Sequence, residues 1–173
     1  MVMESQTLFS AENRVAPLGI ISLAGAQELS RKVEAHLVRW AKLAGLDYDT
    51  FLIESSCPRF SSGDGKGMIK STVRGYDLFF IVDVGNYSLT YNYFGQENRM
   101  SPDDHYQDLK RLIQAASGKA HRVNVVMPLL YGGRQHRRSY RESLDCAYML
   151  QELQHMGVSN LLTFDAHDPR VQN

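Results

Sequence analysis

The sequence lacks most of the features that mark secreted and membrane proteins. Its only two cysteines, Cys57 and Cys146, lie far apart and suggest neither a disulfide framework nor a zinc motif. No apolar run approaches the roughly 20 residues that span a bilayer, and the N-terminus lacks the apolar core of a signal peptide. Acidic and basic residues balance at 19 each, so no net field attracts nucleic acid or acidic membranes. We therefore expect a cytoplasmic protein that binds neither nucleic acid nor membranes.

Apolar runs alternate with amphipathic segments along the chain. Short apolar runs predict strands, and apolar residues at three- and four-residue spacing predict helices. We expect strands over 18–24, 49–54, 77–84, 123–127 and 160–164, and helices over 27–44, 102–117 and 139–156. This alternation predicts an α/β fold with a mostly parallel sheet flanked by helices, and a small exposed strand or hairpin after residue 67. Residues 1–17 are expected to form a loose arm and residues 18–173 a single domain.

One strand, loop and helix start carry the clearest chemical signal. A buried strand ends at Pro128, because proline has no N–H to give to a sheet, and a glycine-rich loop follows. Four basic residues fall within five positions of that loop: Arg134, His136, Arg137 and Arg138. Open α/β sheets bind ligands at the carboxyl ends of their strands, and guanidinium groups there favour a phosphate. The alternative is a solvated basic helix start that pairs with Glu142.

Other stretches are also candidates for ligand binding. The last strand leads into Asp165, His167 and Asp168, which suit a divalent cation or, alternatively, form a capped turn with a surface histidine. The turn over 59–65 either presents Phe60 as an exposed stacking platform or tucks it into the core. The polar and aromatic loop over 85–100 exceeds a usual connection, and such loops are lids, interfaces or disordered segments. Four histidines are expected on the surface: His36, His105, His121 and His155.

Four stretches, taken in order, resemble one known family. Arg-Phe-Ser-Ser-Gly-Asp-Gly over 59–65 is similar to the family's Arg-Phe-Ser-Asp-Gly-Glu turn, and Val-Arg-Gly over 73–75 follows at the family's distance. Tyr-Gly-Gly-Arg-Gln over 131–135 is similar to its Tyr-Ala-Arg-Gln loop with one extra glycine. Phe-Asp-Ala-His over 164–167 is similar to its Asp-Leu-His cation signature. The family is ribose-phosphate pyrophosphokinase, and the resemblance covers its N-terminal half over roughly residues 19–172.

The resemblance implies a type I phosphoribosyltransferase-like fold and a kinase reaction of nucleotide biosynthesis. Diphosphate would pass from Mg-ATP to ribose 5-phosphate, which yields phosphoribosyl pyrophosphate and AMP. The resemblance places ATP on a set of six residues: Phe60, Ser62, Gly63, Asp64, Arg134 and Gln135. It places Mg²⁺ on Asp165 and His167, and an inhibitory nucleotide and phosphate site on Thr72 and Arg74.

The resemblance also implies partners beyond this chain. The turn at Phe60 would reach into a neighbouring subunit, so a homo-oligomer is expected. Ribose 5-phosphate would bind mainly to a second domain after residue 173, which would carry the catalytic lysine. The chain would then be the N-terminal half of a two-domain enzyme, with no catalytic residue of its own and no activity alone.

The sequence departs from the family pattern at several positions. His136 and Ser139 stand where the family has aspartates, Ser62 and Asp64 replace Asp or Asn and then Glu, and the loop over 85–100 is longer. These departures motivate an alternative, a catalytically inactive regulatory or scaffolding relative that co-assembles with a true synthetase. A free-standing phosphate- or nucleotide-binding module is a third hypothesis.

Overall fold

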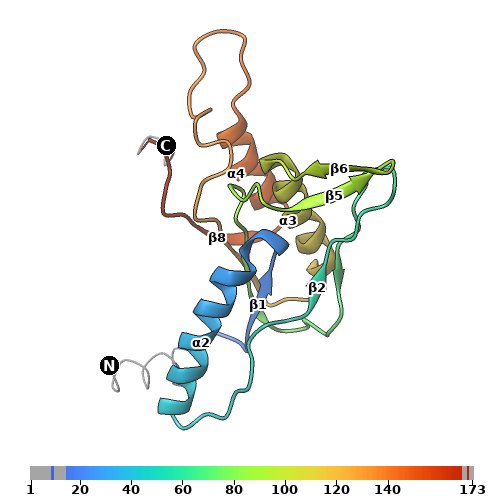
Figure 1. The fold of residues 1–173 in the computed structure, drawn as a ribbon. Helices are drawn as coiled ribbons and strands as arrows, with labels where there is room; N and C mark the ends of the chain where they lie inside the picture. The colour runs from blue at the N-terminus through green and yellow to red at the C-terminus, as the bar shows by residue number, and fades with distance from the viewer. Residues whose placement is uncertain (1–8, 10–14, 169–170, 172–173) are drawn as a thin grey trace.

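Four parallel strands form the centre of the molecule (Figure 1). The computed structural model describes residues 9, 15–168 and 171, so most of the arm expected over 1–17 lies outside the described residues. The sheet has the order β1-β4-β7-β8, with these bounds: β1 (Leu18–Ser22), β4 (Asp77–Ile81), β7 (Arg122–Val126) and β8 (Val158–Leu162). The expected α/β fold with a mostly parallel sheet is confirmed.

Helices cover both faces of this sheet. Helix α2 (Gln27–Leu43), preceded by the short 3₁₀ helix η1 (Ala24–Ala26), packs with Ile20, Phe51 and Ile81 on one face. Helices α3 (Pro102–Ala116) and α4 (Asp145–His155) pack with Leu78, Phe80 and other residues on the opposite face. Because both faces are covered, the central strands are mostly apolar rather than alternating, and the buried Asn124 amide donates to the Asp77 carboxylate on the neighbouring strand at 2.7 Å. No helix within the described part of the chain is long and apolar enough to cross a membrane.

The segment expected as a strand over 49–54 is reduced to one parallel bridge. Leu52 pairs with Ile20 on the side of β1 away from β4, and the Ile53 N–H donates to the Ile20 carbonyl at 2.8 Å. The Glu34 carboxylate accepts the amides of Phe51 and Leu52, at 3.0 and 3.1 Å, so the Phe51 N–H is not available to extend the pairing with β1. After β1, the chain therefore runs first to Leu52 on one side of β1 and then to β4 on the other side. Such a topological switch point leaves a crevice at the carboxyl ends of β1 and β4, where open sheets bind ligands.

Two small antiparallel ribbons flank the main sheet. Strands β2 (Ser55–Ser56) and β3 (Met68–Ile69) pair with each other, so the small strand expected after residue 67 is present. The long loop expected over 85–100 is instead largely a hairpin of β5 (Thr90–Tyr93) and β6 (Gln96–Arg99). Phe94 and Gly95 connect its strands with φ of 47° and 81°. Two consecutive positive φ values suit a two-residue turn whose twist matches that of the flanking strands. β5 and β6 therefore pair with each other across this turn.

The last helix starts later than the sequence suggests. The expected helix over 139–156 begins at Asp145, and residues 131–144 form turns and bends. Its buried residues are Cys146, Met149 and Leu153, so the apolar periodicity that a helix needs begins only there. The basic residues before it are mostly exposed and bury nothing that would support another helical turn.

The N-terminus of α3 offers a test of the local fold. The Ser101 hydroxyl accepts the Asp104 N–H at 3.2 Å, and the Asp104 carboxylate accepts the Ser101 N–H at 2.8 Å. Ser101→Ala is expected to lower the free energy of unfolding by about 1 kcal/mol, measured by urea denaturation followed by circular dichroism. Ser117→Ala, at the other end of α3, is the matched control and should stay within roughly 0.5 kcal/mol of wild type. Equal losses in the two variants would contradict this role of the cap.

Candidate functional site

The structure divides the predicted ligand residues among three places. The turn with Phe60 and Asp64 lies against the tip of the β5–β6 hairpin. Arg134, Asp165 and His167 line one cleft beyond the carboxyl ends of β7 and β8. Thr72 and Arg74 are exposed in the segment before β4, at the opposite edge of the sheet, with the Arg74 N–H 3.4 Å from the Thr72 hydroxyl.

The turn over 59–65 is tight and presents an aromatic ring to solvent. The Phe60 N–H donates to the Asp64 carbonyl at 2.7 Å, and the Gly63 N–H donates to the Phe60 carbonyl at 2.9 Å. The Ser62 hydroxyl donates to the Asp64 carboxylate at 2.8 Å. Phe60 is 56% exposed, so it is not tucked into the core. The turn therefore offers a ring face with a hydroxyl and a carboxylate beside it.

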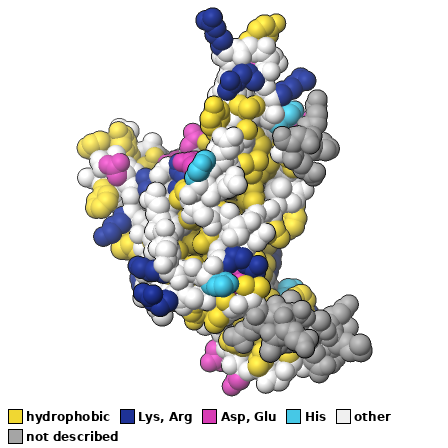
Figure 2. All heavy atoms as spheres, turned by 180° about the vertical axis from the view of Figure 1, so that it is seen from behind, with side chains coloured by type: hydrophobic (Ala, Val, Ile, Leu, Met, Phe, Trp, Pro, Cys, Tyr) yellow, Lys and Arg dark blue, Asp and Glu magenta, His cyan; other side chains and the backbone are white. Residues whose placement is uncertain are grey.

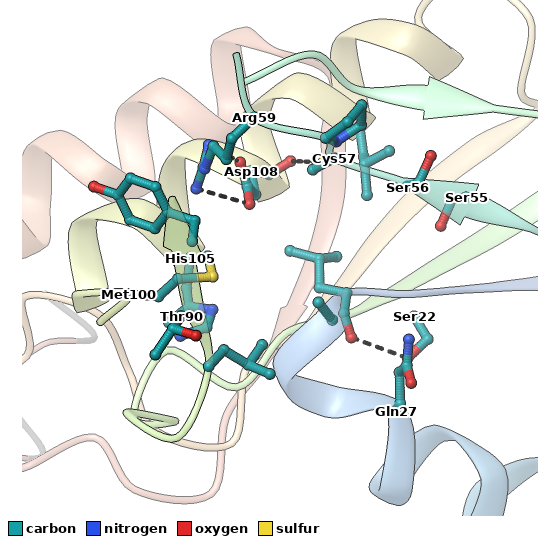
Figure 3. A pocket seen from close by; sticks show the side chains of 16 residues that line it. Ser22, Gln27, Ser55, Ser56, Cys57, Arg59, Thr90, Met100, His105 and Asp108 are labelled. Atoms are coloured by element: carbon teal, nitrogen blue, oxygen red, sulfur yellow. Dashed lines mark hydrogen bonds and ion pairs between the residues drawn. The ribbon is translucent and has the colours of Figure 1, made fainter. Parts of the chain in front are cut away.

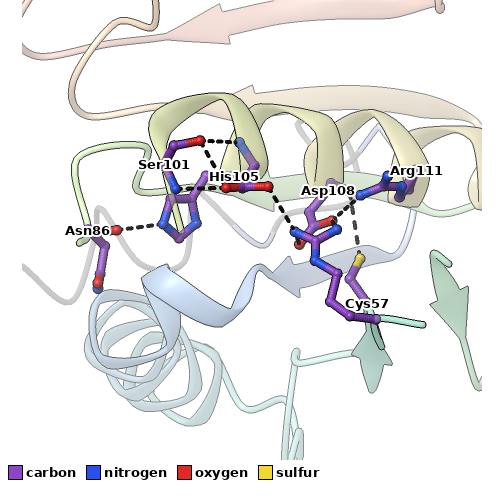
Figure 4. A network of polar contacts seen from close by, with 8 residues as sticks. Cys57, Asn86, Ser101, His105, Asp108 and Arg111 are labelled. Carbon is purple, nitrogen blue, oxygen red and sulfur yellow. Dashed lines mark hydrogen bonds and ion pairs between the residues drawn. The ribbon is translucent and has the colours of Figure 1, made fainter. Parts of the chain in front are cut away.

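A buried ion pair fixes this turn to α3 (Figure 4). The Arg59 guanidinium donates to both carboxylate oxygens of Asp108, at 2.7 and 3.1 Å, and the two side chains are only 8% and 9% exposed. Arg111 donates to the same carboxylate at 2.7 Å. The Arg59 guanidinium also lies 5.1 Å from the centre of the Tyr91 ring on β5. Because a bidentate pair fixes direction as well as distance, Arg59 holds both the turn and the hairpin in place.

A cavity of about 450 Å³ lies beside this ion pair, at the switch point of the sheet (Figure 3). Its lining comes from the end of β1, the start of α2, the segment over 55–59, β5 and α3, and includes Ser22, Gln27, Ser56, Thr90 and Asp108. The sequence interpretation missed this cavity because its walls come from segments that are distant in the chain. Of the predicted ligand residues, none lines it.

His105 lines the same cavity and corrects one expectation. It was expected on the surface, but it is 1% exposed, and its Nε2 lies 2.5 Å from the Asn86 carbonyl and donates to it. The other three histidines, His36, His121 and His155, are exposed as expected. The sequence did indicate that His105 is buried, because it stands four residues before Leu109 on the apolar face of α3.

The second cleft, of about 350 Å³, lies between the start of α3 and the loops that follow β7 and β8. Arg134, Asp165 and His167 line it with three further polar residues, Asp103, Tyr131 and Asp145. The Tyr131 hydroxyl donates to the Asp103 carboxylate at 2.8 Å, and burial and that carboxylate raise the pKa of Tyr131 to about 12. Tyr131 therefore stays protonated near neutral pH. Gln135 is exposed beside the cleft and does not line it.

Hydrogen bonds hold the two loops of this cleft together. The Leu130 N–H donates to the Asp165 carbonyl at 3.0 Å, and the His167 N–H donates to the Asp165 carboxylate at 3.2 Å. His136 connects the same loops, because its Nε2 lies 3.3 Å from the Asp168 carboxylate and its ring centre 5.8 Å from that of His167. Within the described ranges, no three His, Cys, Asp or Glu side chains form a group that could hold a metal ion. A cation here would need oxygens from a ligand to complete its coordination.

Cys57 provides a pH-dependent test of the cavity wall. Burial, with the nearby Asp108 carboxylate, raises the pKa of Cys57 from 9.0 to about 12. The thiol is therefore protonated at pH 8 and unreactive, because the thiolate is the nucleophile. In a Cys146→Ala variant, alkylation of Cys57 by iodoacetamide at pH 8 is expected to be roughly 100-fold slower in the folded protein than in denaturant. Equal alkylation rates in the folded and denatured protein would contradict this burial of Cys57.

The raised pKa of the Cys57 thiol also means that the free energy of unfolding falls as pH rises from about 9 toward 12.

Comparison with known proteins gives a consistent result. Residues 18–157 match the family model for the N-terminal domain of ribose phosphate pyrophosphokinase. The ribose-phosphate pyrophosphokinase of Corynebacterium ammoniagenes is 25% identical over 157 residues, which cover 90% of this chain and 42% of that protein. That of Bacillus caldolyticus is 28% identical over 119 residues, covering 68% of this chain and 33% of that protein.

A solved structure extends this result to three dimensions. The crystal structure of phosphoribosylpyrophosphate synthetase from Mycobacterium smegmatis matches with a TM-score of 0.67 at 17% identity, over 90% of this chain and 45% of that chain. The two proteins therefore share a fold, and this chain spans less than half the length of the relatives that it matches. Because the family model covers most of the sequence, the chain belongs to the family of ribose phosphate pyrophosphokinase N-terminal domains.

Proposed function

We propose that this chain is the ATP-side domain of a ribose-phosphate diphosphokinase. The full protein would transfer the diphosphoryl group of Mg-ATP to the anomeric hydroxyl of ribose 5-phosphate, giving phosphoribosyl pyrophosphate and AMP. The observation that carries the proposal is that Arg134, Asp165 and His167 line the same cleft. Asp165 and His167 both follow Arg134 by 31 or more positions in the sequence. Because the chain covers less than half of its relatives, the ribose 5-phosphate site and the catalytic groups are proposed to lie in a second domain.

The charges of this cleft suit a magnesium-bound triphosphate. Arg134 offers a fork of N–H donors for phosphate oxygens, while Asp103, Asp145 and Asp165 would repel a bare polyphosphate. A Mg²⁺ ion on the triphosphate offsets that repulsion, and Asp165 and His167 lie where they could help to hold it. Phosphoryl transfer depends mainly on positioning and charge neutralisation, so an arrangement of this kind supports the chemistry without a nucleophile in this domain.

The turn at Phe60 supports a site shared between subunits. Its exposed ring suits stacking on adenine, and Ser62, Gly63 and Asp64 beside it suit the ribose of a nucleotide. Because the turn and the Arg134 cleft are separate within one chain, we propose that the turn serves a nucleotide bound to a neighbouring copy in a homo-oligomer. We further propose that Thr72 and Arg74, both exposed, belong to an effector site for an anion.

A second candidate function is a non-catalytic partner of a true synthetase. His136 favours it, because this residue faces the carboxylate of Asp168 at the position where the family has an aspartate. An altered cleft could still bind nucleotide and assemble with an active subunit. The two candidates differ in whether the full-length protein releases AMP.

The test is an assay of AMP release by the full-length gene product with Mg-ATP and ribose 5-phosphate. Arg134→Ala is expected to lower kcat/KM for ATP by roughly 100-fold, because it removes a donor that neutralises phosphate charge. Arg39→Ala, on the exposed face of α2, is the matched control and should stay within about threefold of wild type. A folded wild-type protein that releases no AMP would refute the enzyme and favour the non-catalytic partner. Equal effects of the two substitutions would refute the role of Arg134.

A further inference from the structure

The tip of the β5–β6 hairpin is attached directly to the turn at Phe60. The Phe94 N–H donates to the Ser61 carbonyl at 2.9 Å. The Tyr93 ring packs against Gly63 so closely that a Cβ at that glycine would lie 2.8 Å from the ring. The hairpin strand β5 also contacts Arg59, which begins the turn, through the Tyr91 ring. The two turns therefore form one rigid projection, in which the hairpin supports the turn.

This projection exposes three aromatic rings. Phe94 is 69% exposed, Phe60 is 56% exposed and Tyr93 is 43% exposed. The Tyr93 and Phe94 rings stand edge to face, with centres 4.8 Å apart. Figure 2 shows hydrophobic side chains on this projection, at the left of the view. Exposed rings that are held in place rather than buried mark a binding surface more often than a structural one.

Phe94 also adopts a backbone conformation that phenylalanine rarely takes. Its φ is 47°, and the only other non-glycine residue with a positive φ in the described part of the chain is His167, in the proposed cation site. Asn, Asp or Gly normally occupies this position of a hairpin turn, because a bulky side chain is strained there. Phe94 gains little burial in return, since most of its surface is exposed despite the contact with Tyr93. Strain with so little burial is typical of residues kept for binding.

Polar groups beside the rings narrow the ligand class. The Ser62 hydroxyl and the Asp64 carboxylate lie on the same turn as Phe60, and a carboxylate accepts hydrogen bonds from sugar hydroxyls. The guanidinium groups of Arg59 and Arg111, which both lie against Gly65 of the turn, are committed to the Asp108 carboxylate. The projection thus suits the uncharged end of a nucleotide, a planar base with its ribose, rather than the phosphates.

We propose that Phe94, at the tip of the hairpin, supplies a second aromatic contact beside Phe60 for the base of the bound nucleotide. Tyr93 is a positioning residue, which packs on Gly63 and sets the angle of the turn. This inference rests on the proposed function, because it concerns the base of the same nucleotide whose phosphates reach Arg134. A competing use of the three rings is self-association, in which they would be buried between copies.

The test compares binding of two probes, Mg-ATP and Mg-tripolyphosphate, to the full-length protein by isothermal titration calorimetry. Phe94→Asn keeps a residue that favours positive φ, so the hairpin should fold at least as well as in wild type. Its dissociation constant for Mg-ATP is expected to rise roughly 5- to 150-fold, the range for loss of one base–aromatic stack. Binding of tripolyphosphate, which has no base, should not change. Tyr87→Ala removes another exposed ring near the hairpin and is the matched control, with both affinities unchanged.

Other outcomes would overturn the inference. An unchanged affinity of Phe94→Asn for Mg-ATP would remove Phe94 from the site. Equal losses for Mg-ATP and tripolyphosphate would mean that the substitution acts on the phosphates or on the fold. A change of oligomeric state in sedimentation, with nucleotide affinity retained, would assign the rings to contact between copies. Because the readout is binding, a wild-type protein that binds Mg-ATP through its base but releases no AMP would refute the proposed reaction and leave this inference standing.

Discussion

The ion pair between Arg59 and Asp108 is the interaction that holds the turn over 59–65, the hairpin and α3 of the candidate site together. It joins residues 49 positions apart and is almost fully buried, so loss of Asp108 would remove the carboxylate that the Arg59 and Arg111 guanidinium groups share, at a cost of about 3–5 kcal/mol. The segment that follows Arg59 passes very close to α3, where a Cβ at Gly67 would lie 2.6 Å from the Arg111 backbone. Only glycine fits there. The glycine-rich sequence after the turn therefore serves close packing as much as flexibility.

The order of the sheet creates the second half of the candidate site. Because β7 and β8 are parallel neighbours, the loops that follow them leave the same edge and meet. The Phe164 and Asp165 amides both donate to the Pro128 carbonyl, at 3.0 and 2.9 Å, so Pro128 ends one strand and anchors the loop after the next. This contact brings Arg134 to Asp165 and His167 without any local motif linking them. The basic loop and the acidic loop are thus parts of one cleft.

The parts of the structure that rest on local patterns could be predicted from the sequence. The α2 and α3 helices follow from apolar periodicity and from the cap at Ser101, and the central strands follow from their apolar runs. The parts that rest on contacts between residues distant in the sequence could not be predicted in this way. The cavity at the end of β1 is assembled from four separate stretches of the chain, and the hydrogen bond of the buried His105 ring goes to the distant Asn86 carbonyl. The hairpin was missed because Phe-Gly stands where Asn-Gly or Asp-Gly would have signalled a turn.

The most direct measurement is a crystal structure of the full-length protein with Mg²⁺ and a non-hydrolysable ATP analogue. We expect the triphosphate against Arg134, with the cation near Asp165 and His167. The adenine should lie against Phe60 and Phe94 of a neighbouring copy. A nucleotide bound instead in the cavity between β1, α3 and the hairpin, with Arg134 and Phe60 free of ligand, would contradict the proposed division of the site between cleft and turn.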